Sequence, residues 1–201
     1  MANFEFCKLH IPEAYEIISF YAEDHRGYFT KGFEQNIFRE HGIEFYCNED
    51  FISCSAKNVI RGMHFQLDHP QAKLVGVVRG CVYDVMVDLR KESPTFGKWY
   101  GTYLSEENHK SLYIPRGCAH GFLSMAPDSI VSYKCDGVYD KKTDTGIMYN
   151  DPDIGISWPI DDISCAILGE RDKHQMSFSD FCRNCSFTPH LIMNSLLGER
   201  K

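Results

Sequence analysis

The residues best able to carry acid–base chemistry lie between positions 61 and 73, and they are Arg61, His64, Gln66 and Lys73. In the segment RGMHFQ, strand alternation is expected to separate Arg61, Met63 and Phe65 from Gly62, His64 and Gln66. Lys73 then opens KLVGVV, the start of the longest β-branched stretch in the chain. Polar side chains on such strands are costly to bury unless they face a wet cavity. The pattern therefore indicates a site inside a barrel, and an edge strand with a solvated polar face is the alternative.

These residue types suit proton transfer next to a developing negative charge. A histidine with an ordinary pKa of ~6.5 accepts a proton near neutral pH, and a carboxylate behind His64 would orient its ring. Lys73 could stabilise an oxyanion as a point charge. Tyr133, in SIVSYKC, could donate a proton from the other side of a substrate. Taken alone, Tyr133 is better explained as a core tyrosine bonded to backbone. For His120 the alternative is a turn histidine satisfied by its own loop.

A metal site is disfavoured on the number of ligands. The segment IPRGCAHGF is similar to the second half of a cupin metal motif, but the first half would need a second histidine where Gln66 stands. A catalytic metal needs about three protein ligands, and His64 with His120 supplies two. The C-x-x-C at 182–185 lies near His174 and His190 without zinc-finger spacing, so two incidental thiols are the better interpretation.

The composition favours a single-domain protein and disfavours several classes of binding partner. A chain of 201 residues and 23.2 kDa suits one domain. A net charge of −7 disfavours nucleic-acid and anionic-membrane partners, although a few local cations could hold a small anion. No apolar run approaches the ~18 residues needed to span a membrane. The nine cysteines are an odd number and no secretory signal precedes them, so we expect reduced thiols in a cytoplasmic protein.

The elements predicted around these residues are mostly strands. Short β-like runs separated by turns extend from Ile43 to Val138, and one or two more are expected before residue 20. A turn is predicted at residues 25–27 and a short helix at about residues 33–40, with a helix or arm packing in the segment 167–181. We expect a single domain over residues 1–181, a sandwich or barrel, followed by a C-terminal tail at 182–201.

Longer motifs point to one family. The chain resembles the dTDP-4-dehydrorhamnose 3,5-epimerases from about Phe20 to Phe181. The resemblance rests on DHRGYF, NVIRGMHFQ, KLVGVVRGCVYDVMVDLRKESPTFGKW, LSEENHKSLYIPRGCAHGF, YKCDGVY, NDPDIGISWP and ILGERD. It implies an all-β, cupin-type jelly roll with a few short helices, which uses no metal or other cofactor. It also implies a homodimer with exchanged arms and a nucleotide-diphosphate sugar as substrate.

The same resemblance assigns roles to residues. His64 would be the general base, oriented by Asp172, and Tyr133 the general acid, while Lys73 would hold the oxygen of a 4-keto group as it becomes an enolate. The residues implied in substrate binding are Arg61 and His120 at the ketone, Arg26 (from the neighbouring subunit) and Arg171 at the diphosphate with Asp144, and Tyr139 at the base.

Departures from the family pattern fall at substrate positions. Lys31 stands where the family has Glu, and Glu49, Asp50 and Phe51 stand where it has Gln-Asp-Asn. Glu49 and Phe51 are therefore candidate binding residues, and the nucleotide, the sugar and the number of inverted carbons stay open. A monofunctional epimerase on a CDP- or GDP-linked sugar, a ketoisomerase, and a catalytically silent nucleotide-sugar binder are the alternatives.

Overall fold

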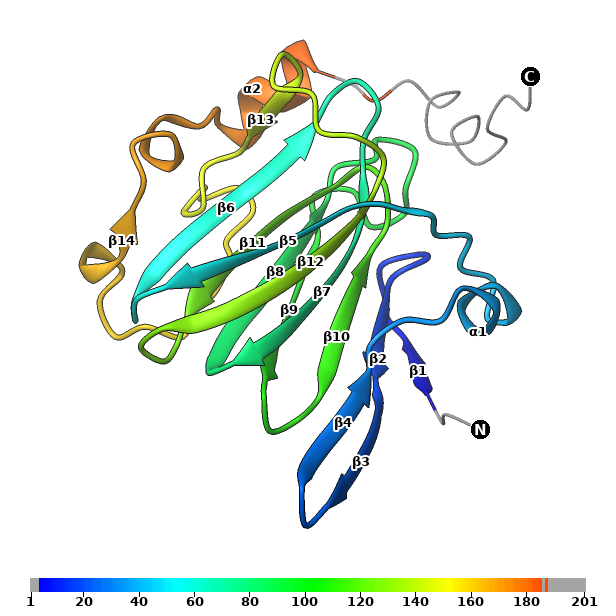
Figure 1. Cartoon of the computed structure of the whole chain (residues 1–201). Helices are drawn as coiled ribbons and strands as arrows, with labels where there is room; N and C mark the ends of the chain where they lie inside the picture. Colours follow the sequence, from blue (N-terminus) through cyan, green and yellow to red (C-terminus); the bar gives the residue numbers. More distant parts are fainter. Residues whose placement is uncertain (1–3, 186, 188–201) are drawn as a thin grey trace.

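A computed structural model describes residues 4–185 and 187, and two antiparallel sheets dominate it (Figure 1). The first sheet has the order β1 (Glu5–Lys8), β2 (Tyr15–Ile18), β10 (Lys110–Ile114), β7 (Ala72–Arg79), β12 (Ser129–Asp136) and β5 (Cys47–Ser55). The second has the order β13 (Asp144–Gly146), β6 (Val59–Gln66), β11 (Cys118–Ser124), β8 (Cys81–Asp88) and β9 (Trp99–Ser105), with β14 (Ile167–Leu168) parallel to β6. The predicted all-β jelly roll with a few short helices is confirmed.

The main core lies between the two sheets. Val75 and Val131 from the first sheet pack in one buried cluster with Val82 and Met86 of β8. The alternate residues of β8, such as Val85, belong to a second cluster on the outer face of the second sheet. Because β8 is covered on both faces, its sequence is a nearly continuous apolar run instead of an alternating one.

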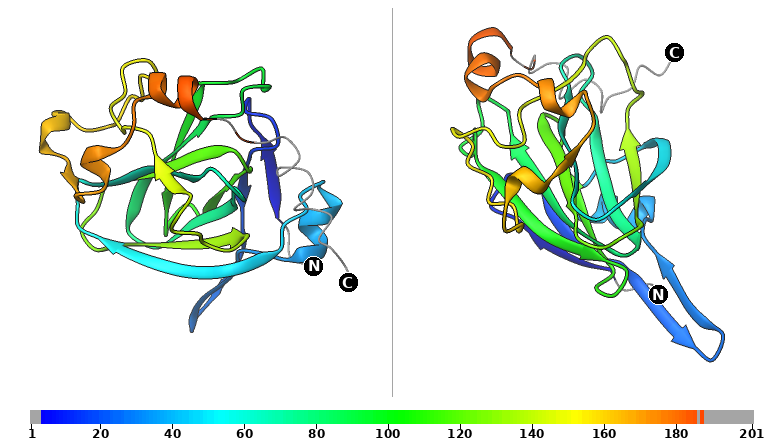
Figure 2. Two further views of the ribbon diagram at one scale, coloured as in Figure 1. Left: turned by 90° about the horizontal axis from the view of Figure 1, so that it is seen from above. Right: turned by 90° about the vertical axis from the view of Figure 1, so that its left-hand side faces the viewer.

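A two-stranded hairpin projects from the body of the barrel (Figures 1 and 2). It consists of β3 (Phe20–Asp24) and β4 (Gly27–Lys31), and its turn at residues 25–26 lies within the turn predicted at 25–27. The predicted helix follows as α1 (Gln35–Glu40), which begins two residues later than expected. The strand expected at 43–47 was wrong, because β5 starts only at Cys47; Ile43 and Phe45 are buried through packing against Phe38 without strand pairing.

The C-terminal segment covers the outer face of the second sheet (Figure 2). It contains the 3₁₀ turns η1 (Ile163–Cys165) and η2 (Asp172–His174), and then α2 (Phe178–Asn184). Phe181 of α2 is fully buried in the outer cluster, which confirms the helix packing expected in the segment 167–181. Most of the tail predicted at 182–201, with His190, lies outside the described residues.

The sequence also predicts reduced cysteines and no membrane-spanning segment. All nine cysteines fall within the described part of the chain, and every one is free. Within that part, no helix has the length and apolar character that crossing a membrane requires.

Candidate active site

His64 of the second sheet and Asp172 form a close pair. His64 lies on β6 and its Nε2 is 2.5 Å from Oδ1 of Asp172, which belongs to η2. Asp172 is buried, and its carboxyl group faces the imidazole ring. The turn η2 therefore fixes the carboxyl group behind the imidazole ring, although the two residues are far apart in the sequence.

The protonation states of this pair follow from burial and hydrogen bonding. Burial lowers the pKa of His64 below its ordinary value of 6.5, against the opposing effect of Asp172. Burial alone would raise the pKa of Asp172, but the hydrogen bond that its carboxyl group accepts from His64 lowers it. A neutral imidazole therefore faces a carboxylate, Nε2–H donates to Asp172, and Nδ1 is the nitrogen that can accept a proton.

A second histidine–carboxyl pair lies beside the first. His120 on β11 is directly opposite His64 in the strand register, and its Nε2 is 2.9 Å from Oδ2 of Asp84 on β8. Both members of this pair are buried. His120 belongs to strand β11 and contacts a side chain of β8, which excludes the alternative of a turn histidine satisfied by its own loop. Sequence reasoning missed Asp84, whose signal is an acidic residue inside the apolar strand CVYDVMVD.

Tyr133 faces this pair from the first sheet. Its ring lies edge-on to His120, with centroids 5.9 Å apart, and stacks on Phe51 with centroids 4.7 Å apart. Its hydroxyl lies 3.2 Å from Oγ of Ser53, so the expected bond to backbone is replaced by one to a side chain. Burial raises the pKa of Tyr133 above its ordinary value of 10.0, which keeps the phenol protonated. Ser53 is a further residue that sequence reasoning missed.

Lys73 lies on β7, where it pairs in register with Cys135 of β12. Burial lowers the pKa of its ammonium group below 10.5, and Cys135, Asp144 and Asp84 oppose that effect. A cavity of about 20 Å³ is lined by Lys73, Gln66 and Asp144 among others. Lys73 is therefore a half-buried cation beside a polar interior.

Arg61 lies on the same strand face as His64, contrary to regular alternation. A bulge between His120 and Phe122 shifts the register, so that Arg61 pairs with Phe122, a residue of the barrel core. Gly62 permits the bulge, because it has a φ of +150° and a Cβ there would lie 2.6 Å from the Cα of Gly121. The guanidinium group bonds to Ser55 and to the backbone of Cys54 on β5, across the gap between the sheets.

The rim of the site consists of Arg171, Asp144, Tyr139, Glu49 and Phe51. Arg171 makes two contacts with Asp144, at 2.7 and 2.8 Å, and the Tyr139 hydroxyl donates to the same carboxyl group at 2.9 Å. Glu49 already uses both oxygens, one for the backbone N–H of Tyr139 and one for the Gln71 amide. Phe51 is about half exposed, with 47% of its surface open.

Two residues from the motif analysis lie away from this group. Arg26 stands at the tip of the projecting hairpin, where it pairs with Asp24 at 2.6 Å and its side chain is 79% exposed (Figure 1). Lys31 pairs with Glu34 at 2.8 Å beside α1. In the part of one subunit that the structure describes, Arg26 therefore lies apart from the other predicted site residues, which belong to the barrel and its rim.

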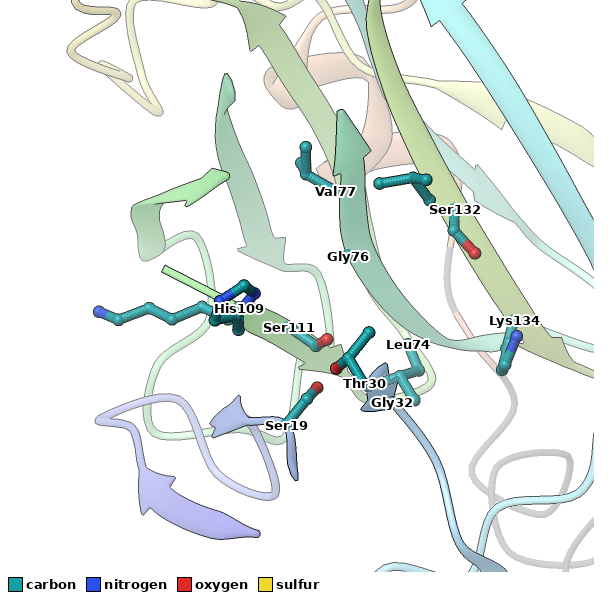
Figure 3. A pocket seen from close by; sticks show the side chains of 12 residues that line it. Ser19, Thr30, Gly32, Leu74, Gly76, Val77, His109, Ser111, Ser132 and Lys134 are labelled. Atoms are coloured by element: carbon teal, nitrogen blue, oxygen red, sulfur yellow. The ribbon is translucent and has the colours of Figure 1, made fainter. Parts of the chain in front are cut away.

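A larger cavity of about 230 Å³ lies elsewhere, on the outer face of the first sheet (Figure 3). Its lining includes Ser132 and Lys134, which alternate with Tyr133 along β12 and therefore belong to the opposite face. The lining also includes Thr30 of the hairpin and Ser111 of β10. None of the predicted site residues lines this cavity.

Comparison with known proteins decides the family. Residues 8–180 match the family model described as dTDP-4-dehydrorhamnose 3,5-epimerase. The chain belongs to the dTDP-4-dehydrorhamnose 3,5-epimerase family. It is therefore an enzyme of the isomerase class, an epimerase acting on sugars.

Individual members of the epimerase family are similar over most of their length. The dTDP-4-dehydrorhamnose 3,5-epimerase of Methanothermobacter thermautotrophicus is 45% identical over 174 residues, which cover 87% of this chain and 94% of that protein. The crystal structure of the Elizabethkingia anophelis enzyme has a TM-score of 0.84 and 41% identity, and the match covers 88% of this chain and 97% of that one. The Legionella pneumophila enzyme in complex with dTDP-4-keto-L-rhamnose has a TM-score of 0.84 and 35% identity, over 88% and 94% of the two chains.

The residues present in the epimerase barrel do not group as a metal site. Over the part of the chain that the structure describes, no three His, Cys, Asp or Glu side chains come together in a ligand set. His64 and His120 each use Nε2 for a different carboxyl group.

Proposed function

We propose that this protein inverts one or both of the carbons beside the ketone of a nucleotide-linked 4-keto-6-deoxy sugar. The first-choice substrate is dTDP-4-dehydro-6-deoxyglucose, which would give dTDP-4-dehydrorhamnose. The observation that carries the proposal is the placement of a neutral His64, held by Asp172, and a protonated Tyr133 on the two different sheets. The named relatives act on, or were solved with, compounds of this kind.

Proton removal is the first step of the proposed mechanism. A proton on the carbon beside a ketone is acidic because the resulting anion delocalises onto the ketone oxygen. Nδ1 of His64 takes this proton, and Asp172 stabilises the imidazolium that forms. Lys73 lies near enough to influence the pKa of His64, and its charge stabilises the enolate oxygen. Because the oxygen gains charge only as the proton leaves, this contact is stronger in the transition state than in the substrate.

Proton return completes the inversion. Tyr133 belongs to the first sheet and His64 to the second, so a sugar between the sheets would meet them from opposite sides. Delivery of the Tyr133 proton to the face opposite the one His64 deprotonated inverts the carbon. Asp84 and His120, with Arg61 on the same strand face, line the ketone side. The reaction needs no redox cofactor, because no electrons are transferred.

The rim is proposed to hold the nucleotide diphosphate. Arg171 supplies a cation and Asp144 positions it through two contacts, while the half-exposed ring of Tyr139 offers a face for stacking on the base. The ring of Phe51, which stacks on Tyr133, is proposed to form one wall of the substrate-binding site. The free cysteines support a reducing, cytoplasmic location for the reaction.

We further propose a homodimer in which the hairpin β3–β4 of one subunit completes the site of the other. Tyr28 and Phe29 on this hairpin are both more than half exposed. Among the described residues, the side chain of Arg26 bonds to Asp24 of the same hairpin. A second copy would cover the aromatic rings and bring the guanidinium group to the diphosphate. Light scattering of the purified chain tests the dimer.

Proton NMR in deuterium oxide tests the proposed reaction, with dTDP-4-dehydro-6-deoxyglucose as substrate. Deuterium entering both carbons beside the ketone supports the 3,5-epimerase, and deuterium at one carbon supports a monofunctional epimerase. Movement of the keto group would identify a ketoisomerase, whereas tight binding without deuterium uptake would identify a silent binder. CDP- and GDP-linked substrates are run in parallel, because Glu49 and Phe51 depart from the family pattern at binding positions.

A further inference from the structure

Gln66, the last residue of β6, is buried and connects two loops through its side-chain amide. Its Nε2 donates to the His69 carbonyl at 3.1 Å, in the turn that follows β6, and to the Val138 carbonyl at 3.3 Å. Its Oε1 accepts from the Asp140 N–H at 2.7 Å. Two of the three bonds therefore hold loop 137–140, which follows β12.

The bonds from Gln66 to this loop fall on both sides of Tyr139. Val138 and Asp140 are its direct neighbours in the sequence, so the backbone is held before and after the ring. At the other end, the Tyr139 hydroxyl donates to Asp144 at 2.9 Å, while the ring itself is half exposed. Tyr139 is therefore a fixed flat surface at the edge of the site. Other side chains bond to single backbone groups of the loop, namely Asn48, Gln71 and Glu49.

The three partners of Gln66 match the donors and acceptor of an amide. The NH₂ group donates twice and meets two carbonyls, and the oxygen meets one N–H. A carboxylate would offer no donor, and a neutral imidazole would offer one donor and one acceptor. Position 66, where a cupin metal motif would carry its second histidine, is therefore occupied by a side chain whose nitrogen and oxygen both bond to backbone.

We propose that Gln66 is a positioning residue for the nucleotide, acting through loop 137–140 and the ring of Tyr139. This inference rests on the proposed function in taking Tyr139 as the surface on which the base stacks. Gln66 lies on the same strand as His64, two residues further on, but its polar atoms bond to loop backbone. Its loss should weaken nucleotide binding and leave proton transfer in place.

The test compares Gln66→Met with Asn108→Leu, because both replace a side-chain amide by an apolar group of similar size. The Asn108 amide also bonds to three backbone groups: it accepts from the N–H groups of Ser105 and Lys110 and donates to the Tyr103 carbonyl. These residues lie in β9, β10 and the loop between them, which carries none of the predicted site residues. Asn108→Leu therefore controls for the loss of three such bonds.

Hydrogen exchange at the Asp140 amide reports the loop without substrate, and calorimetry with dTDP reports nucleotide affinity. In Gln66→Met we expect about tenfold faster exchange at Asp140 and about tenfold weaker dTDP binding, because backbone groups lose their partners. KM should rise by a similar factor with kcat within about twofold of the parent enzyme, as for a loss of uniform binding. Asn108→Leu should exchange faster at Ser105 and Lys110 and bind dTDP like the parent.

Unchanged exchange at Asp140 in Gln66→Met, or faster exchange with unchanged dTDP affinity, would overturn the proposal. A fall in kcat with unchanged dTDP affinity would overturn it too, by placing Gln66 in the chemical step. Gln66→Asn, whose shorter amide cannot reach the loop, takes the place of Gln66→Met if that variant does not fold. A parent enzyme that does not bind dTDP would instead contradict the proposed nucleotide, and the exchange measurement would still decide whether Gln66 positions the loop.

Discussion

His64 and His120 lie directly opposite each other on β6 and β11, and each contacts a different carboxyl group through Nε2. The partner of His64 comes from the turn η2, and the partner of His120 comes from the neighbouring strand β8. The two rings therefore have separate supports. Loss of one carboxyl group should disturb its own histidine and leave the other in place.

Asp172→Asn should lower kcat by about 10²-fold or more, the usual scale of general base catalysis. An asparagine amide can present its NH₂ group to Nε2, which would favour the tautomer with the proton on Nδ1, the nitrogen that must accept the substrate proton. Substrate affinity should change little, because Asp172 faces the histidine. Steady-state kinetics with KM and kcat separated checks this, and a variant with near-parent kcat would remove Asp172 from the mechanism.

The pH profile of kcat/KM should be bell-shaped, with limbs set by His64 and Lys73. His64 must be neutral to act as a base, and its pKa lies below 6.5, so activity falls only as the pH drops through that lowered value. Lys73 must be charged, and its pKa lies below 10.5, so activity falls again as the pH rises through it. Tyr133 is still protonated there, because its pKa is raised above 10.0.

Lys73→Arg tests the assignment of the basic limb. A guanidinium group keeps its charge over the whole range, so the basic limb should move to higher pH even if the rate at the optimum decreases. The acid limb should stay where it is. A basic limb that does not move in Lys73→Arg would contradict the assignment to Lys73.

The fold and the residue types of the candidate site could be predicted from the sequence where the chemistry requires a particular residue type. A barrel follows from dense alternating strands, and the resemblance placed Asp172 with His64 although η2 is remote in sequence. Regular alternation put Arg61 on the wrong face, because a register shift of one residue next to Gly62 and Gly121 cannot be read from spacing.

Other parts of the site depend on the fold alone. Asp84 could have been suspected as an acidic residue in an apolar strand, since such a residue needs a partner. Ser53 and the two oxygens of Glu49 acquire their roles only through the pairing of β5 with β12 and the course of loop 137–140. Their partners are distant in sequence, and no local pattern specifies them.

Arg116→Met should destabilise the protein by about 3 kcal/mol, as expected when one member of a buried ion pair is removed. Arg116 contacts Asp136 at 2.7 Å, both side chains are buried, and Arg116 also donates to the Pro70 carbonyl. Burial already raises the pKa of Asp136 above 3.8, and without Arg116 the carboxyl group loses the contacts that oppose this shift. Chemical denaturation measures the free energy of unfolding.

Lys134→Met is the matched control for Arg116→Met. It breaks the exposed Lys134–Asp50 pair, which should cost about 0.5 kcal/mol or less. Equal losses of stability in the two variants would show that burial of the Arg116 pair has no special cost.

The most direct test of the account is solvent-proton exchange followed by NMR in deuterium oxide, in the parent enzyme, His64→Ala and Tyr133→Phe. The parent should incorporate deuterium beside the ketone and release inverted sugar. His64→Ala should do neither, whereas Tyr133→Phe should exchange the proton that His64 removes and yield little inverted product. Exchange in His64→Ala at the parent rate, or full inversion by Tyr133→Phe, would contradict proton transfer between these two residues.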